Sequence, residues 1–271
     1  MPSQPRRTYD NQRSKHSARR EALASDWFGG QSSVTTDHAV QDFWLQNLLK
    51  ADAFTRWVVD EISPWLGQQI LEVGCGIGTY TAVLADGTRK IVAMDMEREF
   101  VEEATRRVGH LPNVEVIYGD ATRMDVRAPN QGTFDTIILL DVLEHIENDV
   151  ALLERLRARL SPGGHLILKV PAMPSLYSPM DQAIGHWRRY DKKGLRNVFR
   201  RAGLDVVEVN SFNAFAVPGW WLNGRILKRR APPGEQIAFF NLLIPFLRPL
   251  DRIVRLCFGA SLVGIGRLPT L

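Results

Sequence analysis

The chain has 271 residues, of which 45% are hydrophobic and 24% are charged, and its formal net charge is +4. This composition excludes collagen-like, coiled-coil and wholly disordered chains. Two cysteines, Cys75 and Cys257, are too few for a disulfide scaffold or a four-cysteine zinc site. A reducing, cytoplasmic compartment is therefore the expected location.

The positive charge is concentrated at the two ends of the chain. Residues 1–20 contain six basic residues and one acidic residue, and residues 214–271 contain eight basic and two acidic residues. The segment between them contains 20 basic and 27 acidic residues. We therefore expect an acidic body with two basic appendages, a pattern that argues against nucleic acid as the partner because no continuous basic groove is evident.

The first 66 residues divide into a tail and a helical segment. Residues 1–25 are polar and rich in arginine and serine, which predicts a flexible basic tail. They lack the apolar stretch of a secretory signal, and a transit peptide is the weaker alternative. Residues 26–66 predict a helical segment, since apolar residues recur there at three- and four-residue steps from about Thr35. No apolar run reaches the ~18 residues of a membrane-spanning helix.

From residue 67 onward, β-rich runs alternate with helical stretches. The expected strands are Gln69–Val73, Lys90–Asp95, Val114–Tyr118, Phe134–Leu140 and His165–Val170, and the expected helices are Tyr80–Ala85, Glu97–Val108, Asn148–Leu160 and Lys193–Ala202. This alternation predicts an α/β fold in which helices cover both faces of a parallel sheet. Ligands of such sheets bind beyond the carboxyl ends of the strands.

A glycine-rich loop follows the first expected strand. Gly74, Gly76 and Gly78 are spaced by two residues after Glu72 and Val73. Glycines at these positions permit a sharp turn and a close approach of a ligand to the backbone. The competing dinucleotide pattern G-x-G-x-x-G fails by one residue, because its last position falls on Thr79.

Six segments in register resemble the class I S-adenosylmethionine-dependent methyltransferases. They are the glycine loop, the strand end at Asp95, the turn Gly119–Ala121, the strand start Phe134–Asp135, the segment Asp141–His145 and the turn Ser161–Gly164 before the fifth strand. The resemblance covers about residues 65–213 and the last ten residues. It implies a Rossmann-like, seven-stranded, mostly parallel sheet with an antiparallel last strand, S-adenosyl-L-methionine as the cofactor, and methyl transfer as the reaction.

The resemblance also implies which residues bind the cofactor. Asp95 would accept hydrogen bonds from both ribose hydroxyls, and Met96, Asp120 and Ala121 would contact the adenine. Glu72 and the glycines Gly74, Gly76 and Gly78 would flank the methionine end, and the backbone at Leu140 and Asp141 would close the site. For Asp95 and Asp120 a structural alternative is open, because acidic residues at strand ends often cap the next helix.

Three residues are candidates for catalysis. An oxygen or nitrogen acceptor must lose a proton, and His145 and His186 follow the fourth and fifth strands, where a base could act. His186 begins the pattern His-x-Arg-Arg-Tyr, which ends at Tyr190, the third candidate. As an alternative, Trp187 and Tyr190 pack this loop onto the core while its arginines pair with Asp181 and Asp191. For His145, a structural role at a helix start is the alternative.

The prolines Pro171, Pro174 and Pro179 predict that the loop before His186 joins neither helix nor sheet.

No metal site is predicted, although metal-assisted methyl transfer stays open. Asp141, Glu144, His145 and Asp149 crowd one turn. Carboxylates with one imidazole suit magnesium or manganese better than zinc.

The closest resemblance is to bacterial small-molecule and glycan-associated methyltransferases that have the His-x-Arg-Arg-Tyr loop. A sixth strand is expected at Leu204–Asn210 and a seventh at Ala260–Gly266, with an aromatic and basic helical insertion between them at residues 211–259. Such an insertion, at residues 214–258 above all, suits a cap over the acceptor, a contact with a membrane surface or a homodimer contact.

The expected function is therefore methyl transfer to a secondary-metabolite, lipid-linked or glycosidic acceptor in a domain of residues 67–271. Methylation coupled to carbon-centred cyclisation and a catalytically silent cofactor-binding scaffold are the alternatives. RNA is disfavoured, because residues 140–143 lack the Pro-Pro-aromatic motif of nucleic-acid amino methylation.

Overall fold

The computed structural model describes residues 37–123 and 134–270, which all belong to one structural unit. The expected basic tail and the first part of the expected helical segment lie outside these residues. The division into tail, helical segment and methyltransferase domain therefore stays a prediction.

Seven strands form one sheet in the order β3-β2-β1-β4-β5-β7-β6. They are β1 Gln69–Val73, β2 Lys90–Asp95, β3 Val114–Tyr118, β4 Phe134–Leu140, β5 Leu160–Pro171, β6 Asp205–Phe212 and β7 Ser261–Arg267. The pairs from β3 through β5 are parallel, and β7 is antiparallel to both β5 and β6. This arrangement confirms the expected fold class, and the first four strands have the expected bounds.

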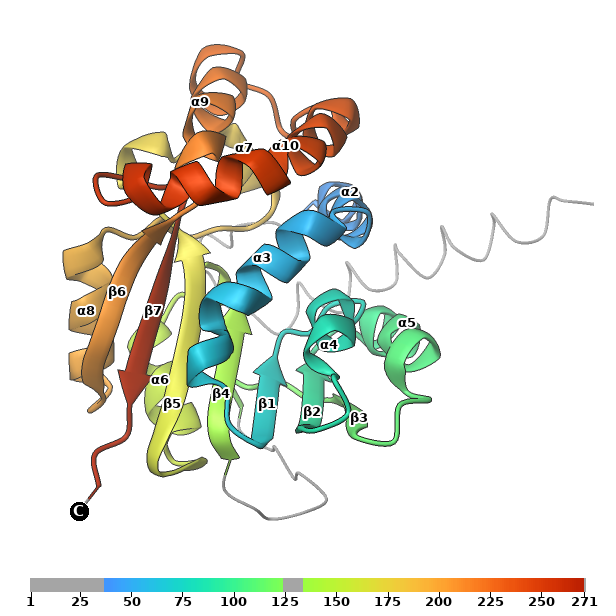
Figure 1. Cartoon of the computed structure of the whole chain (residues 1–271), viewed down its shortest axis with the longest axis vertical. Coiled ribbons are helices and arrows are strands. Elements are labelled where there is room, and N and C mark those ends of the chain that lie inside the picture. The colour runs from blue at the N-terminus through green and yellow to red at the C-terminus, as the bar shows by residue number, and fades with distance from the viewer. Residues whose placement is uncertain (1–36, 124–133, 271) are drawn as a thin grey trace, which may run out of the picture. The chain divides into compact units, whose positions relative to one another are not determined.

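Helices cover both faces of the sheet (Figure 1). The α-helices are α2 His38–Leu49, α3 Asp52–Ile62, α4 Thr79–Leu84, α5 Arg98–Val108, α6 Asp149–Arg157, α7 Pro179–Ala183, α8 Lys192–Arg201, α9 Val217–Trp220 and α10 Gly234–Val254. Short helical turns are η1 Ser63–Trp65, η2 Leu143–His145, η3 Pro174–Leu176, η4 Ala214–Ala216 and the π-helical turn η5 Trp221–Ile226.

Two hydrophobic cores hold these layers together. Apolar side chains of α6 and α8 pack on one face of the sheet, and those of α3, α4 and α5 pack on the other. The central strand β4 is buried on both faces, because Ile137, Ile138 and Leu139 are all inaccessible to solvent. Continuous apolar runs of this kind are typical of strands in doubly covered parallel sheets.

Two local expectations need correction. Ser161–Gly164 lies within β5 instead of preceding it, and the pairing with β4 is interrupted there, between the partners Phe134 and Thr136. The turn is therefore an irregularity inside the strand, with Gly163 at φ 77°. Pro174 and Pro179 do not exclude helix either, since each stands in the first turn of a short one, η3 or α7. Proline is tolerated there because a first-turn N–H has no intrahelical partner.

The insertion between β6 and β7 forms η4, α9, η5 and α10, which we call the cap, residues 214–258. Figure 1 shows α7, α9 and α10 beyond the end of the sheet toward which the arrows of the parallel strands point. This is the edge at which ligands bind in such folds. In the described part of the chain, no helix combines the length and the apolar character that crossing a membrane requires.

Candidate functional site

The glycine loop turns sharply between β1 and α4. Gly74, Gly76 and Gly78 have φ values of 74°, 54° and 77°, a region in which side chains are strained. A Cβ on Gly74 would also lie 2.4 Å from Cγ2 of Val142. The N–H groups of Gly74 and Cys75 donate to the carbonyl of Met94, so the loop is tied to the end of β2.

Asp95, the last residue of β2, holds this loop from the side. Its Oδ2 accepts a hydrogen bond from the Gly76 N–H at 2.8 Å, and its Oδ1 accepts one from the Glu97 N–H at 2.9 Å. Burial raises the pKa of Asp95, although these N–H groups act in the opposite direction. Each carboxylate oxygen still has a lone pair for a further donor. Met96 beside it is exposed.

Glu72 lies beneath the loop in β1. It is buried and accepts a hydrogen bond from the Thr81 hydroxyl at 2.6 Å. Burial, with the charge of Asp95 added, raises the pKa of Glu72 to about 7, although the Thr81 bond opposes this. The hydroxyl of Tyr80 is buried and has no hydrogen-bond partner among the described residues. Burial and the charges of Asp141 and Glu72 raise its pKa.

The remaining cofactor candidates follow β3 and β4. Asp120 accepts hydrogen bonds from the N–H and the hydroxyl of Thr122 at 2.8 and 2.7 Å, so it stabilises a turn and does not cap a helix in the described residues. Ala121 and Leu140 are buried, and Asp141 has a positive φ of 58°. Because β3, β2, β1 and β4 are neighbours in this order, all these residues line one edge of the sheet.

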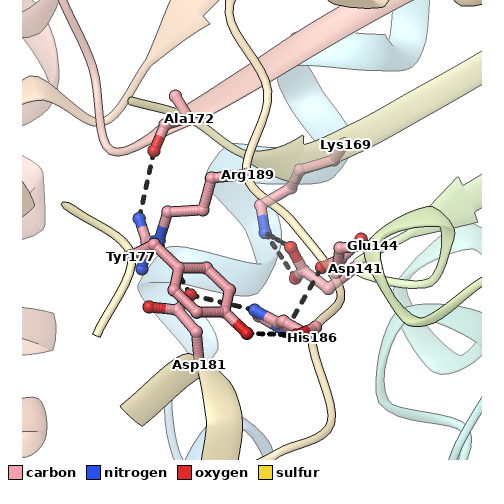
Figure 2. Close-up of polar contacts among 8 residues, drawn as sticks. All are labelled: Asp141, Glu144, Lys169, Ala172, Tyr177, Asp181, His186 and Arg189. Atoms are coloured by element: carbon pink, nitrogen blue, oxygen red, sulfur yellow. Dashed lines mark hydrogen bonds and ion pairs between the residues drawn. The ribbon is translucent and has the colours of Figure 1, made fainter. Parts of the chain in front are cut away.

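Asp141 pairs with a lysine that sequence reasoning missed. The Lys169 ammonium donates to both carboxylate oxygens of Asp141, at 2.6 Å to Oδ1 (Figure 2). Lys169 is buried in β5, and its Nζ lies 5.5 Å from the centre of the Phe54 ring. The sequence contained a signal for this pair, because Lys169 lies within the apolar run of residues 166–171 and a buried lysine must find a negative partner.

The loop after β5 is organised by a buried carboxylate. Asp181 Oδ1 lies 3.0 Å from His186 Nδ1 and accepts a hydrogen bond from Arg189 Nε at 2.7 Å, as Figure 2 shows. Arg189 also donates to the carbonyl of Ala172. Burial works to raise the pKa of Asp181, but the bond from His186 and the charge of Arg189 outweigh it and hold the pKa below its ordinary value. Asp181 is therefore ionised, and Nδ1 of His186 is the nitrogen that bears a hydrogen.

The other side of His186 faces Glu144. Its Nε2 lies 3.7 Å from Glu144 Oε1, which is too long for a hydrogen bond. Both carboxyl oxygens of Glu144 are buried and have no hydrogen-bond partner in the described ranges. Burial, reinforced by the charge of Asp141, raises the pKa of Glu144 well above its ordinary value. This shift favours the protonated, neutral form of Glu144.

The His145 ring packs edge-on against His186, with 4.7 Å between the ring centres. Burial and the charge of His186 lower the pKa of His145 to about 3, so it is a weak base. The Tyr190 hydroxyl donates to Asp149 Oδ2 at 2.9 Å, and burial together with the charge of Asp149 raises its pKa. Of the three catalytic candidates, only His145 and His186 lie together.

Two expectations about this loop are wrong. Arg188 pairs with Asp149 at 3.1 Å, and not with Asp191, whose carboxylate caps α8 by accepting the Gly194 N–H. The group of possible metal ligands also differs from the one that the sequence suggested, because Asp149 is bound by Tyr190 and Arg188. The group whose ligand atoms lie within 4.8 Å of one another is Glu144, His145 and His186. The sequence could not show that His186 approaches the other two.

Aromatic side chains connect the site loop to the cap and to α2. The Arg189 guanidinium lies 4.5 Å from the centre of the Trp220 ring, and Trp220 stacks on Trp44 at 5.7 Å with an interplanar angle of 4°. Trp220 belongs to α9 and Trp44 to α2. A helix before the sheet and the insertion after β6 therefore meet over the buried Asp181–Arg189 pair.

Comparison with known proteins decides the family. Residues 38–209 match the model of the methyltransferase-domain family. The chain belongs to this family. It is an S-adenosylmethionine-dependent methyltransferase domain, and S-adenosyl-L-methionine is its cofactor. The residues at the carboxyl ends of β1 and β2 fit that cofactor, because the three loop glycines adopt a positive φ without side chains, and the unpartnered Tyr80 hydroxyl offers a buried polar group.

Similar curated proteins include an uncharacterized 37.1 kDa protein in transposon TN4556 of Streptomyces fradiae, 29% identical over 184 residues, or 65% of this chain and 52% of that protein. The ubiquinone biosynthesis O-methyltransferase of Vibrio parahaemolyticus is 27% identical over 147 residues, or 54% of this chain and 57% of that enzyme. The chain spans about half the length of these relatives.

Two solved structures share the fold. A chain from the complex of the Haloferax volcanii Trm112 methyltransferase activator with a putative methyltransferase aligns with a TM-score of 0.62 and 16% identity, over 88% of this chain and 99% of that one. The [4+2]-cyclase SpnF aligns with a TM-score of 0.55 and 18% identity, over 81% of this chain and 82% of that one.

Proposed function

We propose that this methyltransferase transfers a methyl group to a hydroxyl group of a small amphipathic acceptor, with His186 as the general base. Two observations support the choice of oxygen. The Vibrio parahaemolyticus relative is named as an O-methyltransferase. In addition, the residues beyond β4 and β5 offer both a proton acceptor and a proton donor in a buried setting, which suits a hydroxyl group better than a carbon acceptor.

The proposal rests on the approach of His186 Nε2 to Glu144 Oε1, a buried oxygen without a hydrogen-bond partner among the described residues. The two atoms are 3.7 Å apart, so one oxygen atom can lie at hydrogen-bond distance from both. In its protonated form, which burial favours, Glu144 donates a hydrogen bond to this oxygen, and Nε2 accepts the hydroxyl hydrogen. A buried carboxyl without a partner is costly, which supports a ligand as its missing partner.

The roles of the residues follow from this arrangement. The bound cofactor would supply an electrophilic methyl group, whose carbon–sulfur bond breaks to leave the sulfur as a neutral thioether. Glu144 and His186 orient the acceptor hydroxyl, and His186 Nε2 takes its proton as the oxygen–carbon bond forms. Asp181 holds the Nδ1 hydrogen, fixes the ring and stabilises the positive charge that the ring acquires. Arg189 keeps Asp181 ionised and in place.

The cofactor contacts are part of the same proposal. Asp95 has the free lone pairs to accept the ribose hydroxyls, and Met96 and the Asp120–Ala121 turn lie next along the edge. The loop glycines, with Glu72 beneath them and Leu140 and Asp141 beside them, suit the methionine end. His145 and Tyr190 act as positioning residues, because His145 packs against His186 and Tyr190 anchors the loop through Asp149.

Replacing His186 tests the proposal. We expect His186→Gln to lower the rate of tritiated methyl transfer to a panel of phenols and catechols by about 10²–10⁴-fold, because the base is lost. Cofactor affinity measured by calorimetry should stay unchanged. His145→Gln should cost less than about tenfold, since a group with a pKa of about 3 accepts few protons. His165→Gln is the matched control, because His165 pairs with Thr136 near the start of β4, away from the carboxyl end of that strand. Equal losses in the His145 and His186 variants would contradict the assignment.

A divalent cation is a second use of the same side chains. Glu144, His145 and His186 offer ligand atoms within 4.8 Å of one another, and Asp181 binds the far nitrogen of His186 as carboxylates behind metal-bound histidines do. Exhaustive chelation distinguishes the two uses. Methyl transfer that survives chelation supports His186 as the base, whereas loss of transfer with recovery on adding magnesium or manganese supports the cation.

A further inference from the structure

Within residues 37–123 and 134–270, most of the exposed large apolar side chains lie in the cap. Of the 14 large hydrophobic residues that are exposed among the described ones, 11 lie between residues 221 and 258. Concentration of exposed apolar residues in one segment marks an interaction site, whereas single scattered residues need no explanation. The cap is therefore the part of the described surface that requires a partner.

One face of α10 forms a regular apolar stripe, which consists of Phe239, Leu242, Phe246, Leu250 and Ile253. The members are spaced by three or four residues, so they share one side of the helix. Their side chains are between 54% and 73% exposed. At 1.5 Å per residue, the stripe is about 21 Å long.

The protein holds this stripe outward. Asp251, on the opposite face of α10, is buried and accepts hydrogen bonds from the backbone N–H groups of Asn213 and Ala214 at 3.3 and 2.7 Å. Arg248 pairs with Asp60 of α3 at 2.8 Å, and Asn241 accepts the Phe54 N–H at 3.1 Å. Figure 1 shows α10 next to the upper part of α3. Since the polar contacts fix the inner face, the apolar stripe cannot rotate into the core.

Positive charge accompanies the stripe. Arg225, Lys228, Arg229 and Arg252 are exposed on the cap and contact no carboxylate within residues 37–123 and 134–270. Glu235 is the exposed acidic residue of the cap, because Asp251 is buried. A segment that combines an outward apolar helix face with exposed arginine and lysine residues has the composition of a segment that lies on an anionic lipid surface.

We propose that α10 docks on an anionic lipid surface, with the apolar stripe inserted among the lipids and the cap cations against their headgroups. The positive charge of the cap favours an anionic lipid surface over a second copy of this chain as the partner of the stripe. A second copy related by two-fold symmetry would set cap cations against cap cations. The first 20 residues, with six basic residues and one acidic residue, have the same sign as the cap. This inference goes beyond the proposed reaction and does not depend on it.

Flotation with vesicles tests the proposal without cofactor or acceptor. Wild-type protein should float with phosphatidylcholine vesicles that contain phosphatidylglycerol and stay behind with pure phosphatidylcholine. The double variant Phe246→Ser with Ile253→Ser should bind at least about tenfold more weakly, as should Lys228→Glu with Arg252→Glu. Tyr118→Ser, at an exposed aromatic residue of β3, and Arg200→Glu with Arg201→Glu, on α8, are matched controls that should float like wild type.

Three results would overturn the proposal. The first is wild-type protein that stays in solution with the anionic vesicles. The second is a stripe variant that floats as well as wild type while keeping the wild-type circular dichroism spectrum. The third is a concentration-dependent dimer in sedimentation that the stripe variant abolishes, which would assign the stripe to a second copy. None of these results bears on methyl transfer, so the two proposals can fail separately.

Discussion

The two halves of the carboxyl edge of the sheet are built with different interactions. In the glycine-loop half, formed by residues 72–81 and 95–97, carboxylates accept hydrogen bonds from nearby backbone and hydroxyl groups. In the ion-pair half, formed by residues 141–145, 169 and 181–190, carboxylates meet cationic or imidazole side chains of other elements. The first half depends on backbone conformation, whereas the second depends on charge balance among side chains that are largely buried.

The largest effect should come from breaking the charge balance of the ion-pair half. Asp181→Asn leaves the buried Arg189 without its anion, and we expect a loss of about 3–5 kcal/mol in the free energy of unfolding, measured with urea. Glu103→Gln, which removes the partner of Arg106 in an exposed pair on α5, should cost less than about 1 kcal/mol. Equal losses in both variants would show that burial does not separate the two kinds of pair.

A smaller effect should come from changing the backbone freedom of the glycine-loop half. Gly74→Ala combines a positive φ with a contact against the stiff side chain of Val142, and we expect a loss of about 2–4 kcal/mol together with lost cofactor binding in calorimetry. Gly87→Ala is the matched control, because φ is +86° but no atom lies within 4 Å of the added Cβ. It should cost about 1 kcal/mol and leave binding intact. Normal cofactor binding by Gly74→Ala would contradict the role of the loop.

The smallest effect concerns Glu72, the one carboxyl of the glycine-loop half with a pKa raised to about 7. The native state retains its proton where the unfolded state has lost it, so ionisation of Glu72 reduces stability as the pH rises from about 4.5 to 7. In cofactor-free protein, Glu72→Gln should raise the free energy of unfolding by about 1–3 kcal/mol at pH 8 and by almost nothing at pH 4. A gain that does not depend on pH would exclude ionisation as its cause.

Much of the fold could be predicted because its signals are local. Each of the strands β1 to β4 is a short apolar run that ends at a glycine, an acidic residue or a turn, so its bounds follow from a few neighbouring residues. Ser161–Gly164 shows where this logic fails. The segment reads as a turn, yet the paired strand continues through it because β4 supplies partners on both sides of the irregularity.

The candidate site also consists of a part that the sequence predicts and a part that it does not. The glycine loop and Asp95 were recognisable because spacing along the chain determines a strand, a turn and a strand end. The partners of Asp181 were only partly predictable. Arg189 pairs with it as the structural alternative required, but Arg188 turns to Asp149 on α6, since the choice between two nearby acids depends on where helices pack.

The sequence by itself determined the α/β sheet, the glycine loop and the concentration of basic charge in the cap, because periodicity, glycine positions and charge are properties of neighbouring residues. Only the tertiary structure decided that His186 lies between Asp181 and Glu144, that Lys169 neutralises Asp141, and that the apolar stripe of α10 faces outward. These features arise when buried charges must find partners from other elements and when packing on α3 determines which face of α10 remains exposed.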